Sequence, residues 1–387
     1  MKNVITLGIF LFIGILNAQL TTIPFEENNL VFIKVKVNDQ EEALNFVFDT
    51  GATTTVLDKK VAQRLGIQPT ATTYAQGTAG SQKYEIAQRQ KIKIQNLNLE
   101  GIRLVLVDLE ELEQRTGVAL EGIIGYDILR RYVTQFNFKE KTISLYEHID
   151  EVPFLEDHKQ FPMTFKNTSI PLVGLEYTLA DGKKLQGDFL FDSGANLTVL
   201  FNTPYAKKNR LQRKVGKTIT GKARGLTKSS AFIMGSIEGL TLFDYTFGNM
   251  PVQLATTNTG VSGSKRYAGI LGAKIINRLD MVLDYAGGHF YFKPNTNFEK
   301  PFEFPLSGFT IEKRDGRVYI ETLVEGSNAQ QKGVEEKDEL LGIDGVSEPN
   351  LRTYRKLLKK EGHTVKLKLK TPSGTIKEVD IQLKRLI

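Results

Sequence analysis

A twelve-residue segment occurs twice in this chain, and the repetition constrains the fold more than any other feature. The first copy, residues 46–57, reads FVFDTGATTTVL, and the second, residues 189–200, reads FLFDSGANLTVL, so that eight of the twelve positions are identical. An apolar segment that ends in glycine follows each copy, GIIG at 122–125 and GILG at 269–272. The offset is 143 residues for the first pair and 147 for the second. Such self-similarity indicates two related units of about 130–140 residues.

The segments between these copies predict a mostly β chain. Short alternating or apolar runs, separated by Gly, Asn and Thr, indicate strands at residues 31–37, 92–99, 103–107, 133–138 and 142–146. Periodicity typical of a helix is first found near the C-terminal end, at residues 351–360. The chain is therefore expected to bury its apolar residues in sheets.

Asp49 and Asp192 stand at matching positions of the two copies. In each copy an apolar strand leads to the Asp in a tight turn, where glycine lets another backbone approach closely. The neighbouring hydroxyls of Thr50 and Ser193 can fix the turn by hydrogen bonds to the backbone. If the two units pack about a pseudo-twofold axis, the two carboxyls meet and share one proton, because both cannot ionise easily at about 3 Å. Such a pair can activate a water and protonate the carbonyl oxygen that the water attacks.

A simpler interpretation is that both aspartates are ordinary turn or N-cap residues, since Asp and Gly are common in turns. The repetition of the whole segment favours the catalytic interpretation. Composition supports it, because the chain has no cysteine and four histidines, with no H-E-x-x-H pattern. Thiol catalysis and metal-dependent hydrolysis therefore lack their usual residues. A serine hydrolase or a nucleotide-binding protein is equally unsupported, because G-x-S-x-G, Walker and G-x-G-x-x-G motifs are missing.

The net charge of +7 does not indicate a nucleic-acid-binding protein. The densest basic run lies between Lys356 and Lys370, and at residues 365–370 lysine alternates with apolar residues. This alternation predicts a strand with one solvated face, and we expect no nucleic acid as a partner.

The repeated segments resemble the aspartic protease family, in a bilobal form whose lobes are each similar to a retroviral-type subunit. The segments that carry the resemblance are residues 46–57, 122–146, 189–200 and 269–292. The resemblance implies two homologous β-barrel lobes about a pseudo-twofold axis, with a cleft for an extended peptide between them. It implies a catalytic dyad of Asp49 and Asp192. The residues that would support this dyad are Thr50, Gly51, Ser193 and Gly194, together with the apolar-apolar-Gly elements Ile123, Ile124, Gly125, Ile270, Leu271 and Gly272.

The family also has Gly-rich hairpins, called flaps, that close over the substrate about 20 to 30 residues after each Asp. Matching windows lie at residues 74–80 and 218–225. The candidate flap residues are Tyr74, Gly77, Gly80 and Gly221. Such a hairpin could exclude water and donate backbone N–H groups to the substrate, although Gly/Thr-rich turns are also ordinary loops.

Ala52 and Ala195 follow the two glycines, where many bilobal members of the family have Ser or Thr. A missing hydroxyl donor disfavours the charged form of a carboxylate. We therefore expect the dyad to titrate at a higher pH than in gastric-type enzymes, with activity at mildly acidic to neutral pH.

From about residue 300 the chain resembles a PDZ domain, a small α+β fold. Asp315-Gly316 is a hairpin signal between two alternating segments, and residues 340–345 form a Leu-x-x-Ile-Asp-Gly turn. The resemblance implies that a loop binds the C-terminal carboxylate of a peptide added to the sheet edge. This loop would be Leu306, Ser307, Gly308 and Phe309. It has one glycine where the better-known version has two, so a docking or lobe-stabilising module without a free peptide is the alternative.

The first 18 residues predict a secretory signal peptide. Lys2 precedes the uncharged residues 4–16, and Ala18 provides a small residue before a cleavage site. The apolar run is shorter than the roughly 18 to 20 residues that span a bilayer, although a retained membrane anchor is the alternative. We expect an exported protein, periplasmic or extracellular, without a membrane span after cleavage.

The sequence thus predicts four segments: the signal peptide 1–18, lobes at 19–152 and 153–299, and the PDZ-like domain 300–387. The predicted function is that of an exported aspartic endopeptidase that needs no metal or cofactor, with a PDZ-like domain for substrate or partner recruitment. The alternative is a catalytically weak or inactive peptide-binding or scaffold protein of the cell envelope. Binding alone, however, requires neither the paired aspartates nor their glycine and hydroxyl neighbours.

Overall fold

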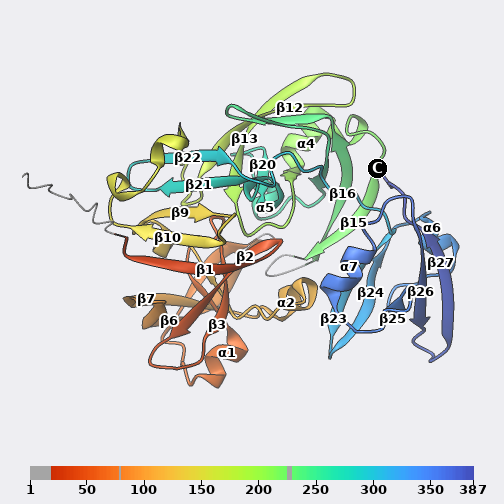
Figure 1. The fold of residues 1–387 in the computed structure, drawn as a ribbon, viewed down its shortest axis with the longest axis horizontal. Helices are drawn as coiled ribbons and strands as arrows, with labels where there is room; N and C mark the ends of the chain where they lie inside the picture. Colours follow the sequence, from red (N-terminus) through yellow and green to blue (C-terminus); the bar gives the residue numbers. More distant parts are fainter. Residues whose placement is uncertain (1–18, 78–79, 225–228) are drawn as a thin grey trace, which may run out of the picture.

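A computed structural model describes residues 19–77, 80–224 and 229–387 (Figure 1). In this part of the chain the regular structure is mostly strand, in three sheets, and the helices are short. The predicted mostly β fold with an additional smaller unit at the C-terminal end is confirmed. Across the same ranges, no helix combines the length and the apolar character needed to cross a membrane. The predicted signal peptide lies outside the described residues.

The first sheet contains most of the strands of the first half of the chain. In sheet order, the described strands are β11 (Lys159–Pro162), β22 (His289–Pro294), β21 (Leu279–Asp284), β9 (Val133–Asn137), β10 (Thr142–Tyr146), β1 (Thr21–Asn28), β2 (Leu30–Val37), β3 (Leu44–Phe48), β8 (Gly122–Ile124), β4 (Val56–Asp58), β7 (Leu97–Val107), β6 (Gly80–Ile94) and β5 (Ala71–Gly77). A further pairing of β2 with β6 closes the strands from β2 to β6 into a barrel. The central strands β3 and β8 run parallel, and their nearly all-apolar sequence suits strands that are covered on both faces.

The second sheet repeats this order of strands. Its described strands are, in sheet order, β15 (Ile219–Arg224), β16 (Ser229–Ile237), β19 (Met250–Ala255), β14 (Val199–Phe201), β20 (Gly269–Gly272), β13 (Lys184–Asp192), β12 (Leu172–Thr178), β17 (Gly239–Leu242) and β18 (Tyr245–Phe247). Seven of these strands correspond to strands of the first sheet and have the same parallel and antiparallel pairings. In sheet order they are β12, β13, β20, β14, β19, β16 and β15, which correspond to β2, β3, β8, β4, β7, β6 and β5. β17 starts two residues after β16 ends and pairs with β12, so this ring closes through a strand interrupted at Glu238.

Strands from both halves share one sheet. β21 pairs antiparallel with β9, which places Met281 opposite Phe136, and β11 pairs with β22. The first sheet therefore continues across the predicted lobe boundary at residues 152–153. This shared sheet holds the two halves against each other through main-chain hydrogen bonds, which are directional and satisfied only at one register.

The predicted strand at residues 92–99 is wrong. β6 ends at Ile94 and β7 begins at Leu97, with a turn between them. Gln95 in this turn has a φ of 54°. The residues alternate correctly on both sides of the turn, so periodicity alone did not reveal the reversal of the chain.

Short helices connect the strands. The described α-helices are α1 (Lys59–Arg64), α2 (Glu110–Thr116), α3 (Tyr126–Leu129), α4 (Thr203–Asn209), α5 (Ala273–Ile276), α6 (Asn328–Gln331) and α7 (Leu351–Leu357). The described 3₁₀ turns are η1 (Ile149–Glu151), η2 (Leu155–Asp157), η3 (Leu211–Arg213) and η4 (Val261–Gly263). α3 and α5 follow β8 and β20 directly, one in each half.

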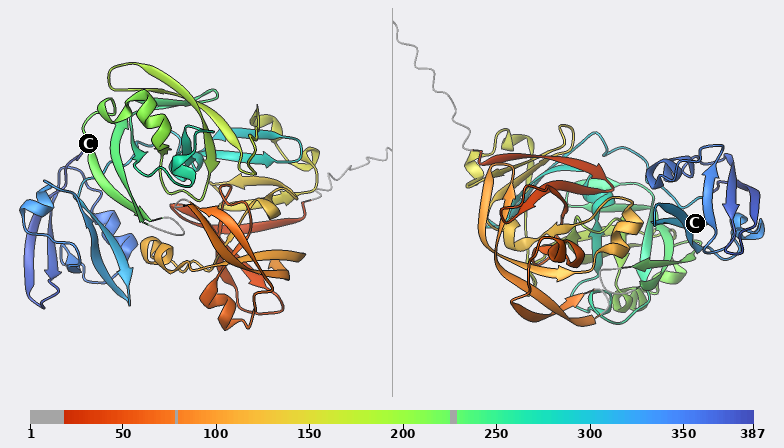
Figure 2. Two further views of the ribbon diagram at one scale, coloured as in Figure 1. Left: turned by 180° about the vertical axis from the view of Figure 1, so that it is seen from behind. Right: turned by 90° about the horizontal axis from the view of Figure 1, so that it is seen from below.

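The third sheet, called the C-terminal sheet below, lies at one side of the molecule (Figure 2). Its described strands are β23 (Phe309–Arg314), β24 (Arg317–Leu323), β25 (Glu339–Ile343), β26 (Thr364–Lys370) and β27 (Ile376–Gln382). The sheet packs with α6 and α7 around an apolar core of its own. Asp315 and Gly316 join β23 to β24 with φ values of 48° and 75°, as a two-residue hairpin turn requires. The predicted helix at 351–360 is shorter in the structure and ends at Leu357.

Candidate functional site

The two Asp-containing turns face each other and are joined by reciprocal hydrogen bonds. The Thr50 hydroxyl donates to the carbonyl oxygen of Phe191 (2.8 Å), and the Ser193 hydroxyl donates to the carbonyl oxygen of Phe48 (3.1 Å). Each hydroxyl oxygen also accepts the N–H of the other residue, at 2.9 Å for Thr50 and 3.0 Å for Ser193. Both side chains are buried. Residues 143 positions apart in the sequence therefore fix one another, and buried donors and acceptors are satisfied in both halves.

The carboxyl groups of Asp49 and Asp192 lie beside each other at this contact, each against the glycine of the opposite turn. Asp49 Oδ1 accepts the N–H of Gly51 at 2.7 Å and that of Gly194 at 3.1 Å. The same Gly194 N–H lies 3.0 Å from Asp192 Oδ1, so it bridges the two carboxyls. The structure therefore brings the two aspartates together, with one main-chain N–H within hydrogen-bonding distance of both carboxyls.

Gly51 and Gly194 permit this approach. A Cβ atom on Gly51 would lie 2.3 Å from Cγ of Asp192, and a Cβ on Gly194 would lie 2.3 Å from Cγ of Asp49. Each carboxyl group thus packs directly against the glycine of the opposite turn. No residue with a side chain fits at either position without moving a carboxyl group.

The environment raises the pKa of both carboxyls. For Asp192, burial is the main cause and the negative charge of Asp49 adds to it, so the pKa lies well above its ordinary value. Burial also raises the pKa of Asp49, but the N–H of Gly51, the carboxyl of Asp192 and the N–H of Gly194 stabilise the charged form and oppose the rise. One proton shared by the pair, with Asp192 as its main holder, is the state that these influences favour.

The apolar-apolar-Gly elements lie against the two turns. β8 pairs with β3, so that Ile123 and Ile124 lie opposite Val47 and Phe48. The matching pairs between β20 and β13 are Ile270 with Leu190, Leu271 with Phe191 and Gly272 with Asp192. A Cβ on Gly125 would lie 2.7 Å from the Thr54 carbonyl oxygen, and one on Gly272 would lie 2.3 Å from that of Leu197. Both glycines therefore admit the close packing of the element on the Asp turn.

Apolar side chains pack beside the Asp turn in each half. In the first half, Ala52 belongs to a cluster with Val118, Leu120 and Ile123. In the second half, Ala195 belongs to a cluster with Ile270. An apolar wall on each side of a carboxyl pair suits the side chains of an extended peptide.

A hairpin follows each Asp turn at the position predicted for the flaps. In the β5–β6 hairpin, Gly77 pairs with Gly80, and the Tyr74 side chain is 74% exposed. In the β15–β16 hairpin, Gly221 pairs with Phe232, whose ring leaves no room for a Cβ at Gly221. Parts of both predicted windows, residues 78–79 and 225, lie outside the described residues. The structure therefore contains both hairpins but does not test their role in substrate binding.

Sequence reasoning missed Tyr285, which follows β21. Its side chain is 9% exposed, and its ring packs edge-on against Tyr126 with centroids 5.6 Å apart. Burial raises the pKa of Tyr285, and the negative charge of Asp49 raises it further. Among the described residues its hydroxyl has no hydrogen-bond partner. The 147-residue offset aligns Tyr285 with Phe138, so the internal repeat could have identified this position as a polar replacement in an apolar site.

The loop Leu306, Ser307, Gly308 and Phe309 belongs to the C-terminal sheet and not to the sheets that carry the aspartates. The Ser307 hydroxyl donates to the Phe309 carbonyl oxygen at 2.9 Å. Gly308 has a φ of 81°, and a Cβ there would lie 2.5 Å from Cβ of Ser327. The single glycine of the loop is thus required by its conformation and by its packing.

Residues 33–128 match the family model described as Aspartyl protease. The aspartyl protease match contains Asp49, Gly51, the β5–β6 hairpin and Gly125, and it ends before the second Asp turn. It supports a peptidase-type function for this chain. The comparison with curated proteins finds no match. In the part of the chain that the structure describes, no three His, Cys, Asp or Glu side chains are grouped so that they could hold a metal ion.

Proposed function

We propose that the protein is an aspartic endopeptidase, in which a water activated between Asp49 and Asp192 hydrolyses the peptide bond. The observation that carries the proposal is the pair of carboxyls at the junction of the two halves, where the N–H of Gly194 lies within hydrogen-bonding distance of both. The aspartyl protease match over residues 33–128 supports the same chemistry.

The proposed mechanism uses the asymmetric protonation of the pair. Asp49, ionised, takes a proton from the water as its oxygen attacks the substrate carbonyl carbon. Asp192, protonated, donates its proton to the carbonyl oxygen, which gives a tetrahedral diol. The C–N bond then breaks as the leaving nitrogen takes up the proton held by Asp49, and Asp192 regains its proton from the diol. The N–H groups of Gly51 and Gly194 hold the Asp49 carboxyl in place throughout.

The substrate of the proposed enzyme is a peptide or protein segment in an extended conformation. The hairpins β5–β6 and β15–β16 would close over it and donate main-chain N–H groups, and the apolar walls around Ala52 and Ala195 would hold its side chains. We further propose that the protein is exported with residues 1–18 as the signal peptide, and that the C-terminal sheet acts as a PDZ-like recruitment domain that binds a peptide C-terminus.

Replacing each Asp by Asn tests the mechanism in the protein comprising residues 19–387. Asp49→Asn and Asp192→Asn keep the shape of the side chain but remove the shared proton. Each is expected to lower kcat on a denatured protein substrate by on the order of 10²–10⁴-fold. Asp188→Asn is the matched control, because Asp188 lies in the same strand as Asp192 with a 43% exposed side chain.

Wild-type activity in either Asn variant would contradict the two-carboxyl mechanism. Absence of cleavage by the wild-type protein, over a range of substrates and pH values, would instead favour a peptide-binding protein. Both results are independent of whether residues 1–18 direct export, which cell fractionation of a tagged full chain would test.

A further inference from the structure

The C-terminal end of α2 is held by the C-terminal sheet. The Arg355 guanidinium in α7 donates to the carbonyl oxygens of Arg115 and Thr116, where α2 ends, and to that of Ile311 in β23 (3.1 Å). Burial lowers the pKa of Arg355, as expected for a cation taken out of water at an interface. These carbonyls are the partly negative end of a helix, which favours a cation. Figure 1 shows α2 beside β23 and α7.

A second contact is made by Gly117, which follows α2 and packs against α7 of the C-terminal unit. Gly117 ends the helix with a φ of 71°, and a Cβ at this position would lie 2.8 Å from Cδ1 of Leu351. Leu351 is buried. Arg115 also forms an ion pair with Glu321 of β24 at 3.4 Å, and the Glu321 side chain is 5% exposed. We call residues 115–117 the α2 turn.

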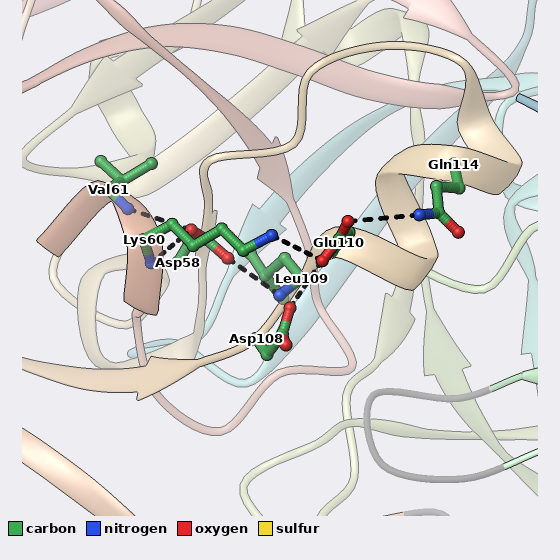
Figure 3. A network of polar contacts seen from close by, with 7 residues as sticks. All are labelled: Asp58, Lys60, Val61, Asp108, Leu109, Glu110 and Gln114. Atoms are coloured by element: carbon green, nitrogen blue, oxygen red, sulfur yellow. Dashed lines mark hydrogen bonds and ion pairs between the residues drawn. The ribbon is translucent and has the colours of Figure 1, made fainter. Parts of the chain in front are cut away.

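The other end of α2 is fixed within the first sheet (Figure 3). Asp58 caps α1 through the N–H groups of Lys60 (2.8 Å) and Val61, and its second oxygen accepts the Leu109 N–H at 2.9 Å. Lys60 pairs with Glu110 in the first turn of α2. α2 itself contains no buried residue. Leu112 packs, partly buried, against the apolar cluster that contains Ala52, and the C-terminal end of α2 is held in addition by the C-terminal sheet.

We propose that the surface formed by Ile311, Glu321, Leu351 and Arg355 is a peptide-binding surface, called the docking face, and that the α2 turn is its internal ligand. A partner peptide of the same chemistry presents two consecutive main-chain carbonyls to Arg355, followed by a glycine in the left-handed conformation over Leu351. Binding of such a peptide and binding of the α2 turn exclude each other.

This competition is coupled to the dyad by a short path. Residues 118–121 connect the α2 turn to β8, and Val118 and Leu120 belong to the apolar cluster that contains Ala52. β8 in turn packs on the first Asp turn. In the second half, β15 contacts β24 of the C-terminal sheet. Displacing the α2 turn therefore loosens one wall of the cleft, and weaker substrate binding is the expected result. This consequence, unlike the binding itself, rests on the proposed function.

A binding experiment tests the proposal without any measurement of activity. The probe is a fluorescein-labelled synthetic peptide of residues 108–120, and the measurement is its fluorescence anisotropy with the protein comprising residues 19–387. In the wild type the tethered α2 turn competes at an effective concentration on the order of millimolar. Gly117→Val places a side chain against Leu351 and removes the competitor, so the peptide should bind at least about tenfold more tightly than to the wild type.

Gly66→Val is the matched control, because Gly66 also follows a helix with a φ of 70° but has no atom within 4 Å of an added Cβ. It introduces the same backbone strain without opening the docking face and should bind like the wild type. A peptide with Val in place of its own glycine should bind none of the proteins. Failure of the labelled peptide to bind the Gly117→Val protein up to about 1 mM, the effective concentration of the tether, would overturn the proposal.

A disulfide provides a second variant that does not depend on the stability of Gly117→Val. The chain has no cysteine, and a Cβ on Gly117 would lie 3.1 Å from Cβ of Leu351, so the two positions need to move apart only slightly to reach the roughly 3.5–4.5 Å of a disulfide. The oxidised G117C/L351C protein should exclude the peptide. After reduction the same protein should bind it. Binding that is equal in the oxidised and reduced forms would contradict an internal ligand at this surface.

Kinetics then test the coupling. Gly117→Val should raise KM by at least about threefold with kcat nearly unchanged, whereas Gly66→Val should change neither. An unchanged KM, with peptide binding as expected, would overturn the coupling to the cleft. If no protein cleaves any substrate but peptide binding follows the expected pattern, the proposed function fails and the internal ligand stands.

Discussion

The two halves of the molecule carry nearly the same Asp turn in different surroundings. In the first half the Thr55 hydroxyl donates to Asp127 at 2.8 Å. In the second half the equivalent Thr198 donates to the carbonyl oxygen of Pro251, and Lys274 stands at the position that corresponds to Asp127. The reciprocal contacts of Thr50 and Ser193 are thus kept in both halves, whereas the partner of the conserved threonine at positions 55 and 198 has changed. The contact between the two Asp turns is therefore symmetric, whereas the support behind each turn is not.

The same comparison explains how a nearly symmetric pair of carboxyls becomes asymmetric. Asp49 accepts two main-chain N–H groups at Oδ1, one of them from the opposite turn, whereas Asp192 accepts the N–H of Gly194, which is shared with Asp49. The charge of Asp49 then raises the pKa of Asp192. Small differences in hydrogen bonding therefore decide which carboxyl holds the proton.

Substituting the two glycines tests the part of the comparison in which the halves are alike, and should have the largest effect. Gly51→Ala and Gly194→Ala each place a methyl group on the opposite carboxyl. Each should lower kcat/KM about 10²-fold or more, because the reacting groups are displaced, and should lower the free energy of unfolding by about 1–3 kcal/mol. Steady-state kinetics and denaturant unfolding measure the two effects.

Gly174→Ala is the control for both substitutions, since Gly174 is an exposed strand glycine with no atom within 4 Å of an added Cβ. It should leave kcat/KM unchanged. A large loss in one half and a small loss in the other would show that the two turns are not equivalent at the junction.

The dependence of stability on pH tests the part of the comparison in which the halves differ. Because the pKa of Asp192 is raised in the folded state, its stabilising contribution is complete below the ordinary pKa of an aspartate and is lost as the pH rises through the raised value. The free energy of unfolding should therefore fall from mildly acidic toward neutral pH. Asp192→Asn should remove more of this fall than Asp49→Asn, as denaturant titrations at several pH values would measure.

The pH–rate profile of the wild type follows from the same pair. Activity should rise as Asp49 loses its proton and fall as Asp192 loses its own, because the mechanism needs one proton on the pair. With alanine at positions 52 and 195, we expect the maximum at mildly acidic to neutral pH. A maximum below about pH 3 would contradict the raised pKa values expected for the pair.

Much of the site could be predicted because the repeat marks it in the sequence. Asp49 and Asp192, their glycines and their hydroxyl neighbours lie in a segment whose duplication is visible without a structure. The apolar strands around them follow from alternation and composition. What duplication cannot show is which residue breaks the symmetry.

The shared sheet and the position of α2 could not be predicted, for two physical reasons. β9 and β21 read as ordinary strands, and nothing in a strand sequence specifies which distant strand it pairs with. α2 has no buried residue, so it lacks the apolar periodicity by which a helix is recognised. Its position depends on a contact with Arg355, about 240 residues further along the chain.

Tyr285 and Phe138 offer the smallest and most specific test of the comparison. Tyr285 has a buried hydroxyl without a hydrogen-bond partner among the described residues, so Tyr285→Phe should leave the free energy of unfolding unchanged or raise it by up to about 1 kcal/mol. Phe138 packs edge-on against Phe25 at 5.4 Å. Phe138→Tyr would bury a new hydroxyl there and should lower the free energy of unfolding by about 1–3 kcal/mol.

The kinetics of Tyr285→Phe separate two explanations of the asymmetry at this position. If Tyr285→Phe is neutral in stability and changes kcat by less than about threefold, the hydroxyl is tolerated and plays no part in the reaction. If it instead lowers kcat and shifts the acidic limb of the pH–rate profile, the hydroxyl acts on the ionisation of Asp49. The negative charge of Asp49 in turn raises the pKa of Tyr285. Phe138 offers no such group, so the second result would make the dyad asymmetric through one side chain of the second half.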